Sequence, residues 1–193
     1  MKEINDLISD TGILTTESVM KEGISKFRFY KYIKENHFEQ VGHGIYISSD
    51  TICDQLFILY KRCPHCVFSH DEAMYYHGLI DREPLQQTIT IYTGYNTKRL
   101  TQDGVKVYTV KKELLEIGKI TVTDNLGNEI PMYDLERTMC DVIRSRSNIE
   151  IQDFNMALKS YVRRYDKDLN KLMKYAKLFN IEKIMRKYME VLL

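Results

Sequence analysis

Short apolar repeats separated by glycines mark the first fifty residues of the chain. Three apolar positions at helical spacing predict a first helix over 2–9: Ile4, Leu7 and Ile8. Two more short helices are predicted over 16–22 and 26–36, with Gly23 between them. Glycine readily adopts the left-handed conformation that ends one helix and lets the next leave at a steep angle. This order of elements is typical of a helix-turn-helix.

Hydroxyl residues and a short hairpin delimit this region. Thr15 and Ser25 precede the two predicted helices, where a side-chain oxygen can accept a hydrogen bond from the first turn. After the second helix, 38–41 and 45–48 alternate between apolar and polar residues, and Gly42-His43-Gly44 joins them. Such a pair of strands predicts a hairpin, or wing, after the helix-turn-helix.

Beyond residue 48 the pattern becomes a mixture of strands and longer helices. A helix capped by Asp50 or Thr51 is predicted to run to about residue 62, and Ser69-His70-Asp71 is predicted to begin another that stops at Gly78. Alternation predicts strands over 66–68, 87–93, 105–110 and 117–123, with a turn over 125–128. Helical periodicity predicts helices over 133–144, 150–165, 168–179 and 181–193.

These elements predict an α+β chain with two domains. Residues 1–48 would form a winged helix-turn-helix, and 49–193 a mixed C-terminal domain in which a small β-sheet precedes a helical subdomain. At 193 residues and 44% apolar composition, the chain is long enough to give both domains a core. The boundary is expected near Ser48–Asp50.

Charge is concentrated locally, because the whole chain carries a net charge of only +1. Between Lys21 and Lys34, five basic residues stand against Glu22 alone. The C-terminal segment 150–193 is a second basic region, with ten basic and six acidic residues. A polyanionic partner would therefore be bound through one of these local surfaces.

The sequence also bears on where the protein acts. The N-terminus is polar, and no apolar run approaches the roughly 20 residues that span a bilayer. Four cysteines without an export signal favour reduced thiols over a disulfide framework. We therefore expect a cytoplasmic protein with no membrane partner.

The second predicted helix presents a basic and aromatic face that suits the major groove of DNA. Its packing side is expected to hold Phe29, Tyr32, Ile33 and Asn36. The DNA-binding residues are predicted to be Ser25, Lys26, Phe27, Tyr30 and Lys31 near the bases, with Arg28, Lys34 and His43 of the wing near the phosphates. Lysines can reach guanine edges or phosphates, and aromatic rings can contact thymine methyl groups. The alternative is a small helical domain with a solvated basic face.

Three stretches follow the predicted wing in order: VFSHDEAMYYHGLIDREP from Val67, TITIYTGYN from Thr88 and YDLERTMCDVIR from Tyr133. Together with the N-terminal region and the helical tail, they make the chain resemble the AbiEi-type antitoxins of bacterial abortive-infection systems over essentially its full length. By this resemblance, 25–36 corresponds to the recognition helix and 38–48 to the wing. Many relatives have arginine where this chain has histidine at the wing tip, and a neutral histidine is a weaker phosphate partner.

The resemblance implies a non-enzymatic protein with two tasks. Its N-terminal domain would bind inverted repeats in the promoter of its own operon and repress it, with two copies of a monomer on one operator. Its C-terminal domain would counteract a partner toxin that resembles a nucleotidyltransferase, in a type IV arrangement without a stable complex. The rival hypothesis is a stand-alone transcriptional repressor whose C-terminal domain senses a ligand or a partner protein.

No motif in the sequence favours an enzyme, a metal site or a cofactor. Cys63-Pro64-His65-Cys66 could be a zinc half-site or a redox dithiol. However, Cys53, His70 and His77 do not supply a second ligand pair at a suitable spacing. A redox dithiol should follow a strand and open a helix, whereas this motif follows a predicted helix.

An acidic trio on one predicted helix could indicate a metal-dependent nuclease. Asp134 and Asp141 would share one face of that helix, but Glu136 would lie away from both. Helix capping and ion pairs with Arg137 or Arg144 are therefore the favoured roles.

The basic C-terminal helices leave two interpretations open. Their candidate second basic surface comprises Lys159, Arg163, Arg164, Lys171, Lys174 and Lys177. These residues could be the solvated faces of amphipathic helices. They could instead contact operator DNA, or an RNA or nucleotide-linked target of the toxin.

Overall fold

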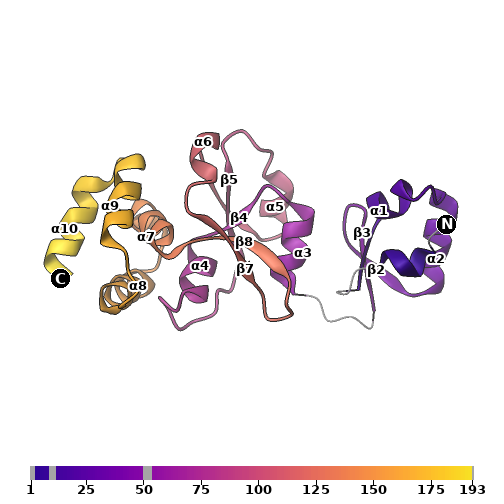
Figure 1. The fold of residues 1–193 in the computed structure, drawn as a ribbon, viewed down its shortest axis with the longest axis horizontal. Helices are drawn as coiled ribbons and strands as arrows, with labels where there is room; N and C mark the ends of the chain where they lie inside the picture. Colours follow the sequence, from indigo (N-terminus) through magenta and orange to yellow (C-terminus); the bar gives the residue numbers. More distant parts are fainter. Residues whose placement is uncertain (1–2, 9–11, 50–53, 193) are drawn as a thin grey trace. The chain divides into compact units, whose positions relative to one another are not determined.

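The computed structural model describes residues 3–8, 12–49 and 54–192. The chain is a mixed α and β structure with two separate sheets (Figure 1). It divides into two compact units, each with a core of its own. Unit 1 comprises residues 1–64 and 123–130, and unit 2 comprises 65–122 and 131–193. The expected domain boundary near Ser48–Asp50 adjoins 50–53, which lie outside the described residues.

Unit 1 begins with short helices and a three-stranded sheet. Its elements are η1 (Ile4–Leu7, a 3-10 turn), β1 (Ile13–Thr15), α1 (Thr16–Lys21), α2 (Lys26–Glu35), β2 (Phe38–Gly42), β3 (Ile45–Ser48) and α3 (Gln55–Arg62). The sheet order is β1-β3-β2, and both pairings are antiparallel. The first helix is thus shorter than predicted. Residues 13–15, which no predicted element covered, form a strand that pairs with the hairpin.

The turn between α1 and α2 follows from the residues that end and begin these helices. Gly23 has a φ of +77°, and the N–H of Ile24 donates to the carbonyl of Val19 at 3.3 Å. This is a Schellman motif, which satisfies carbonyls at the end of α1. The predicted caps are confirmed, because the side chains of Thr15 and Ser25 accept hydrogen bonds from the first turns of α1 and α2.

A small apolar core fixes the two helices against the sheet. It consists of Ile4, Leu14, Val19, Ile24, Phe29, Ile33 and Tyr46. Helix α3 begins later than predicted. The side chain of Asp54 caps it by accepting from the N–H of Leu56 at 2.7 Å, whereas the expected caps at 50 and 51 lie outside the described residues.

The rest of the chain forms the second sheet and the C-terminal helices. The elements are β4 (Val67–Phe68), α4 (Asp71–Tyr76), β5 (Thr88–Tyr92), α5 (Lys98–Gln102), β6 (Lys106–Val110), α6 (Lys112–Leu115), β7 (Lys119–Thr123), β8 (Glu129–Tyr133), α7 (Leu135–Arg144), η2 (Arg146–Asn148, a 3-10 turn), α8 (Ile151–Arg163), α9 (Leu169–Leu178) and α10 (Glu182–Leu192). The strand order is β6-β5-β4-β8-β7. Strand β5 runs parallel to β6 and antiparallel to β4.

The last four helices pack together at the C-terminal end of unit 2 (Figure 1). Their core includes Met139, Leu158, Tyr161, Leu172, Ala176 and Met185, which are all buried. Each helix turns its apolar stripe toward this core, as its periodicity predicts. Among the described residues, no helix is both long and apolar enough to cross a membrane.

Candidate functional site

The exposed side of α2 carries every residue predicted on this helix to bind DNA. Ser25, at its N-cap, is exposed together with Lys26, Phe27, Arg28, Tyr30, Lys31 and Lys34. Phe29 and Ile33 are buried on the opposite side, and Tyr32 is half-buried, as predicted. The packing role predicted for Asn36 is wrong. Its side chain is exposed, because it lies at the C-cap and donates to the carbonyl of Tyr32 at 3.0 Å.

Two aromatic residues on this face differ in how firmly they are held. Phe27 is 80% exposed, whereas Tyr30 is 50% exposed and contacts the rings of Phe29 and Tyr46, with centroids 5.3 Å and 6.5 Å away. Burial of Tyr46 in β3 raises the pKa of its hydroxyl, and the neighbouring Tyr30 raises it further. Tyr30 therefore links α2 to the hairpin, while Phe27 is free to meet a ligand.

The basic residues of α2 are only lightly paired. Lys31 lies 3.7 Å from Glu35, and both side chains are exposed, so water screens this pair. In the part of the chain that the structure describes, Lys26, Arg28 and Lys34 form no ion pair. Arg28 and Lys31 border a hollow of about 270 Å³ beside η1, which places Arg28 on the flank of the helix.

The tip of the hairpin lies beside the start of α1. Gly44, with a φ of +70°, accepts a hydrogen bond from the N–H of Thr16 at 2.8 Å. A bulge between Gln40 and Gly42 shifts the register, and the Gln40 side chain donates to the Gly42 carbonyl at 2.9 Å. These bonds brace the short turn and leave the His43 side chain exposed.

A buried histidine, His70, lies at the centre of a polar cluster in unit 2. The ring of His70 lies within 3.0 Å of two hydroxyls, with Nδ1 near Ser69 and Nε2 near Ser145. The Thr90 hydroxyl donates to the Ser69 hydroxyl at 2.8 Å. The ring also stacks on Tyr108, with centroids 3.4 Å apart. Two of the motifs therefore meet at this polar cluster, and Ser145 directly follows the third motif. The sequence did not indicate the cluster, because its members are far apart in the chain.

His70 also begins α4 in an unusual backbone conformation. Its φ is +50°, and no side-chain hydrogen bond caps the helix, although the sequence predicted a cap here. Burial lowers the pKa of His70 well below its ordinary value, and the nearby charges of Lys106, Arg144 and Arg137 lower it further. Burial also lowers the pKa of His77, partly offset by the carbonyl of Tyr133 beside its Nε2.

We expect stability to fall with acidification because of these two histidines. The pKa of each is lower in the folded chain than the value near 6.5 expected when unfolded, so the unfolded chain binds more protons between the two pKa values. Each should therefore lower the free energy of unfolding by up to about 1.4 kcal/mol per pH unit of acidification in that range. Urea denaturation at several pH values measures this slope. The exposed-site variant His37→Asn should retain it, and an unchanged slope in His70→Asn would contradict the assignment.

The acidic trio of α7 has the structural roles that the sequence favoured. Asp134 caps the helix through the N–H of Arg137 at 2.8 Å. Asp141 pairs with Arg137 and Arg144, each at 3.0 Å. Glu136 accepts from the N–H of Asp168 at 3.0 Å, an anchor for α9 that the sequence did not predict.

The CxxC motif lies between α3 and β4. Cys63 and Cys66 are buried, whereas His65 is exposed. Within the described ranges, no three histidine, cysteine, aspartate or glutamate side chains are grouped as a metal ion requires. Cys53 lies outside those ranges.

The six residues of the second basic surface fall into two groups. Lys159, Arg163, Lys174 and Lys177 are exposed. Lys171 instead pairs with Asp134 at 3.0 Å and Glu136 at 3.3 Å, and Arg164 pairs with Asp166 at 2.6 Å. Lys171 therefore joins α9 to the start of α7. Arg164 joins the end of α8 to the end of α4, because its Nη1 donates to the carbonyl of His77 at 2.8 Å.

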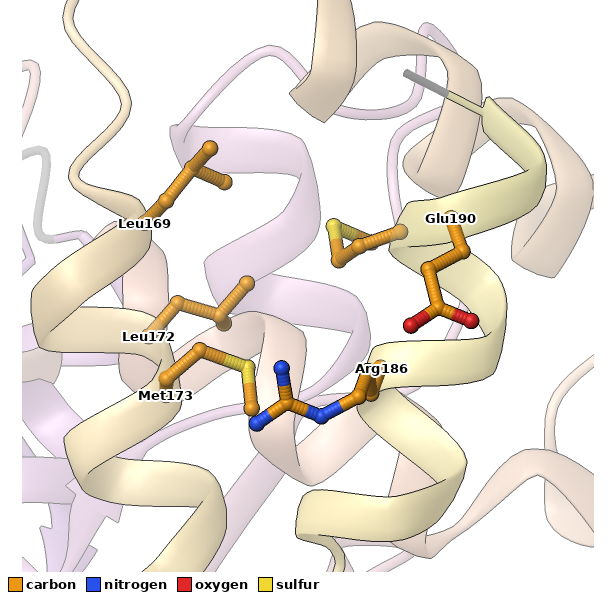
Figure 2. Close-up of a pocket in the computed structure, with 6 residues that line it drawn as sticks. Leu169, Leu172, Met173, Arg186 and Glu190 are labelled. Carbon is orange, nitrogen blue, oxygen red and sulfur yellow. The ribbon is translucent and has the colours of Figure 1, made fainter.

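An open pocket lies between α9 and α10, and the sequence patterns did not indicate it. Its volume is about 300 Å³, and its lining residues are Leu169, Leu172, Met173, Arg186, Met189 and Glu190. In Figure 2, the apolar residues of α9 face Arg186 and Glu190 of α10 across the opening. Amphipathic periodicity identifies both apolar faces, but it does not show that they leave a space between them.

Comparison with known proteins supports the fold. No family model matches the chain, and no curated protein matches it. Among solved structures, the crystal structure of RV2827C protein from Mycobacterium tuberculosis is similar, with a TM-score of 0.65 and 14% sequence identity. The match covers 90% of this chain and 69% of that chain. At this level of identity the similarity shows a shared fold.

Proposed function

We propose that this protein is an antitoxin that also represses its own operon. Residues 1–48 act as a winged helix-turn-helix that binds inverted repeats in the promoter. The C-terminal domain, 49–193, counteracts a nucleotidyltransferase-like toxin of an abortive-infection system, without forming a stable complex with it. The protein acts in the cytoplasm, where the operator lies.

The observation that best supports this proposal is the exposed face of α2. A capped helix follows a tight turn and carries Lys26, Arg28, Lys31 and Lys34 together with the projecting ring of Phe27. Lysine and arginine bind phosphates and guanine edges, and an aromatic ring can contact a thymine methyl group. The hairpin after α2 supplies the wing, with His43 exposed at its tip.

Inverted repeats require two reading heads on one operator. Two monomers would bind half-sites that face the same side of the duplex, one helical turn or a multiple of it apart. Sedimentation analysis of the protein alone and with operator DNA tests this stoichiometry.

Reversing two charges on α2 should abolish repression while leaving antitoxicity intact. We expect Lys26→Glu/Lys31→Glu to weaken operator binding about 30-fold or more, because each lost contact is worth about 1–3 kcal/mol. Lys183→Glu/Lys187→Glu makes the same change at two exposed positions of α10 and serves as the matched control. Electrophoretic mobility shifts at fixed salt measure the affinities.

The same variant separates the two tasks in cells. The α2 variant should derepress a promoter reporter yet still rescue growth when the adjacent toxin gene is expressed. Unchanged operator affinity would reject α2 as the recognition helix. Failure of the wild-type protein to rescue growth would reject the antitoxin role.

The pocket between α9 and α10 favours one alternative. Its volume of about 300 Å³ and apolar lining lie at the lower end of the range for small-molecule sites. A stand-alone repressor could use this pocket to sense an apolar ligand and release its operator. Under that alternative, no toxin gene adjoins the operon, and Met173→Trp, at a half-buried lining residue, should alter the response to inducer while leaving basal repression unchanged.

A further inference from the structure

Three neighbouring strands place one histidine, one tyrosine and one lysine at a single edge of the second sheet. Val67 of β4 pairs with Thr90 of the antiparallel β5, so the position two residues before Val67 lies beside Tyr92. Tyr92 pairs with Val110 of the parallel β6, and Lys112 follows two residues later. His65 and Lys112 therefore flank Tyr92, although the chain separates them widely. Ligands often bind outside the carboxyl ends of parallel strands.

The rings at this edge meet at steep angles. The centroids of His65 and Tyr92 are 6.3 Å apart with an interplanar angle of 65°, and those of Tyr92 and Tyr95 are 5.6 Å apart at 87°. His65 is exposed, and both tyrosines are half-buried. In a perpendicular pair, the edge of one ring meets the face of the other. Each of these three side chains keeps a solvent-exposed part that a planar ligand can contact.

Basic residues follow these rings in the chain, and one of them contacts Tyr92. The two segments at this edge, 92–99 and 110–112, contain four basic residues and no acidic one. These are Lys98, Arg99, Lys111 and Lys112, and all four side chains are exposed. The Lys112 ammonium lies 5.7 Å from the centre of the Tyr92 ring. Beside the rings, Gly94 has a φ of +98° and open space where a Cβ would project.

We propose that this edge binds unpaired bases of a single-stranded nucleic acid. The bases stack on Tyr95, Tyr92 and His65, and Lys98, Lys111 and Lys112 hold the phosphates that follow. Single-strand readers combine aromatic stacking surfaces with a basic track in this way. A duplex cannot use the rings, because its base faces are already stacked within the helix. The site does not depend on the proposed role of α2, which lies in the other unit.

The test uses the full-length protein and a labelled single strand of about eight nucleotides, a length within the usual range of such readers. Fluorescence anisotropy is measured with the strand as DNA and as RNA, and with the matching duplex. The α2 variant Lys26→Glu/Lys31→Glu is included. We expect both chains to bind the single strand equally, even where the variant fails on operator DNA. If the variant lost single-strand binding as strongly as operator binding, the site would lie on α2 and the proposal would be overturned.

Two substitutions of one tyrosine isolate the role of its ring. Tyr95→Leu should weaken single-strand binding about tenfold, since stacking on one side chain is worth about 1–3 kcal/mol. Tyr95→Phe keeps the ring and should bind as the wild type does. Tyr165→Ala, at a fully exposed tyrosine in another loop, is the matched control. Circular dichroism verifies that each variant is folded.

Lys112→Ala gives a second measurement that does not depend on the tyrosine variants. Losing one phosphate contact should reduce the slope of log affinity against log salt by about 0.7 for a single strand. Three results would overturn the proposal. They are no single-strand binding at low salt, an affinity for the duplex equal to that for the single strand, or the same affinity in Tyr95→Leu and Lys112→Ala as in the wild type.

Discussion

Replacing Arg137 with methionine should lower the free energy of unfolding by about 3–5 kcal/mol, the usual cost of removing one partner from a buried ion pair. Arg137 is fully buried, and its Nε donates to Asp141 at 3.0 Å. Its Nη1 donates to the carbonyls of Leu114 at 2.9 Å and Ile117 at 2.6 Å. Methionine keeps an unbranched stem but lacks the guanidinium, so both carbonyls lose this donor and Asp141 keeps only Arg144 as a charged partner.

Aromatic rings add to the role of this guanidinium. Its central carbon lies 3.8 Å from the ring centre of Tyr133 and 4.2 Å from that of Phe179. Arg137→Lys should therefore restore little, because an ammonium cannot make the same planar contacts or reach three acceptors. The expected loss is a large part of the 5–15 kcal/mol that usually stabilises a domain.

Arg144→Met is the matched control for Arg137→Met. Arg144 pairs with the same carboxylate at 3.0 Å, but its side chain is 30% exposed. Arg144→Met should lower the free energy of unfolding by only about 1 kcal/mol, because a partly solvated ion pair contributes little. Urea unfolding followed by circular dichroism measures both variants. Equal losses would show that burial of the guanidinium is not what makes Arg137 important.

Sequence patterns predicted the elements of this chain well where local rules determine them. The caps at Thr15 and Ser25 were identified from residue type alone, and the turn between α1 and α2 from Gly23, because each depends on a few adjacent residues. The strand Ile13–Thr15 was missed because a three-residue strand has too little alternation to detect. Its pairing with β3 depends on the hairpin having already formed.

The candidate sites were predictable to different degrees. Helical periodicity placed the exposed face of α2 correctly, since one helix needs no knowledge of its neighbours. The aromatic edge around Tyr92 and the cluster around His70 could not be predicted in this way, because each draws residues from three separate strands or helices. Only the strand register places Lys112 beside Tyr92.

The three stretches quoted from unit 2 contribute buried polar residues to its framework. Ser69, Thr90 and Asp141 come from these stretches and are all buried and hydrogen-bonded. Removing the partner of a buried polar group destabilises the fold, so such positions tolerate few substitutions. Apolar positions around them can exchange one hydrophobic residue for another. These residues serve the framework of the unit, so the proposed function must be tested at its surfaces.

Phe29→Ala should unfold the α1–α2 region and abolish operator binding, while unit 2 keeps its own core. Phe29 is fully buried and packs edge-to-face on Tyr46, with ring centroids 5.3 Å apart. Removing a buried phenylalanine costs about 3–5 kcal/mol. The small core around it cannot absorb that loss, because small units have little stability to spare. Hydrogen exchange should show loss of protection confined to unit 1.

Phe27→Ala distinguishes loss of the fold from loss of the DNA-binding face. Phe27 precedes Phe29 by two residues on the same helix, but it is 80% exposed and belongs to no core cluster within the described residues. Its replacement should leave hydrogen exchange unchanged and still weaken operator binding, because it removes the proposed contact between the ring and a base. If Phe27→Ala bound the operator as tightly as the wild type, the ring would have no role in recognition. If Phe29→Ala retained both its protection and its binding, the core of unit 1 would have to lie elsewhere.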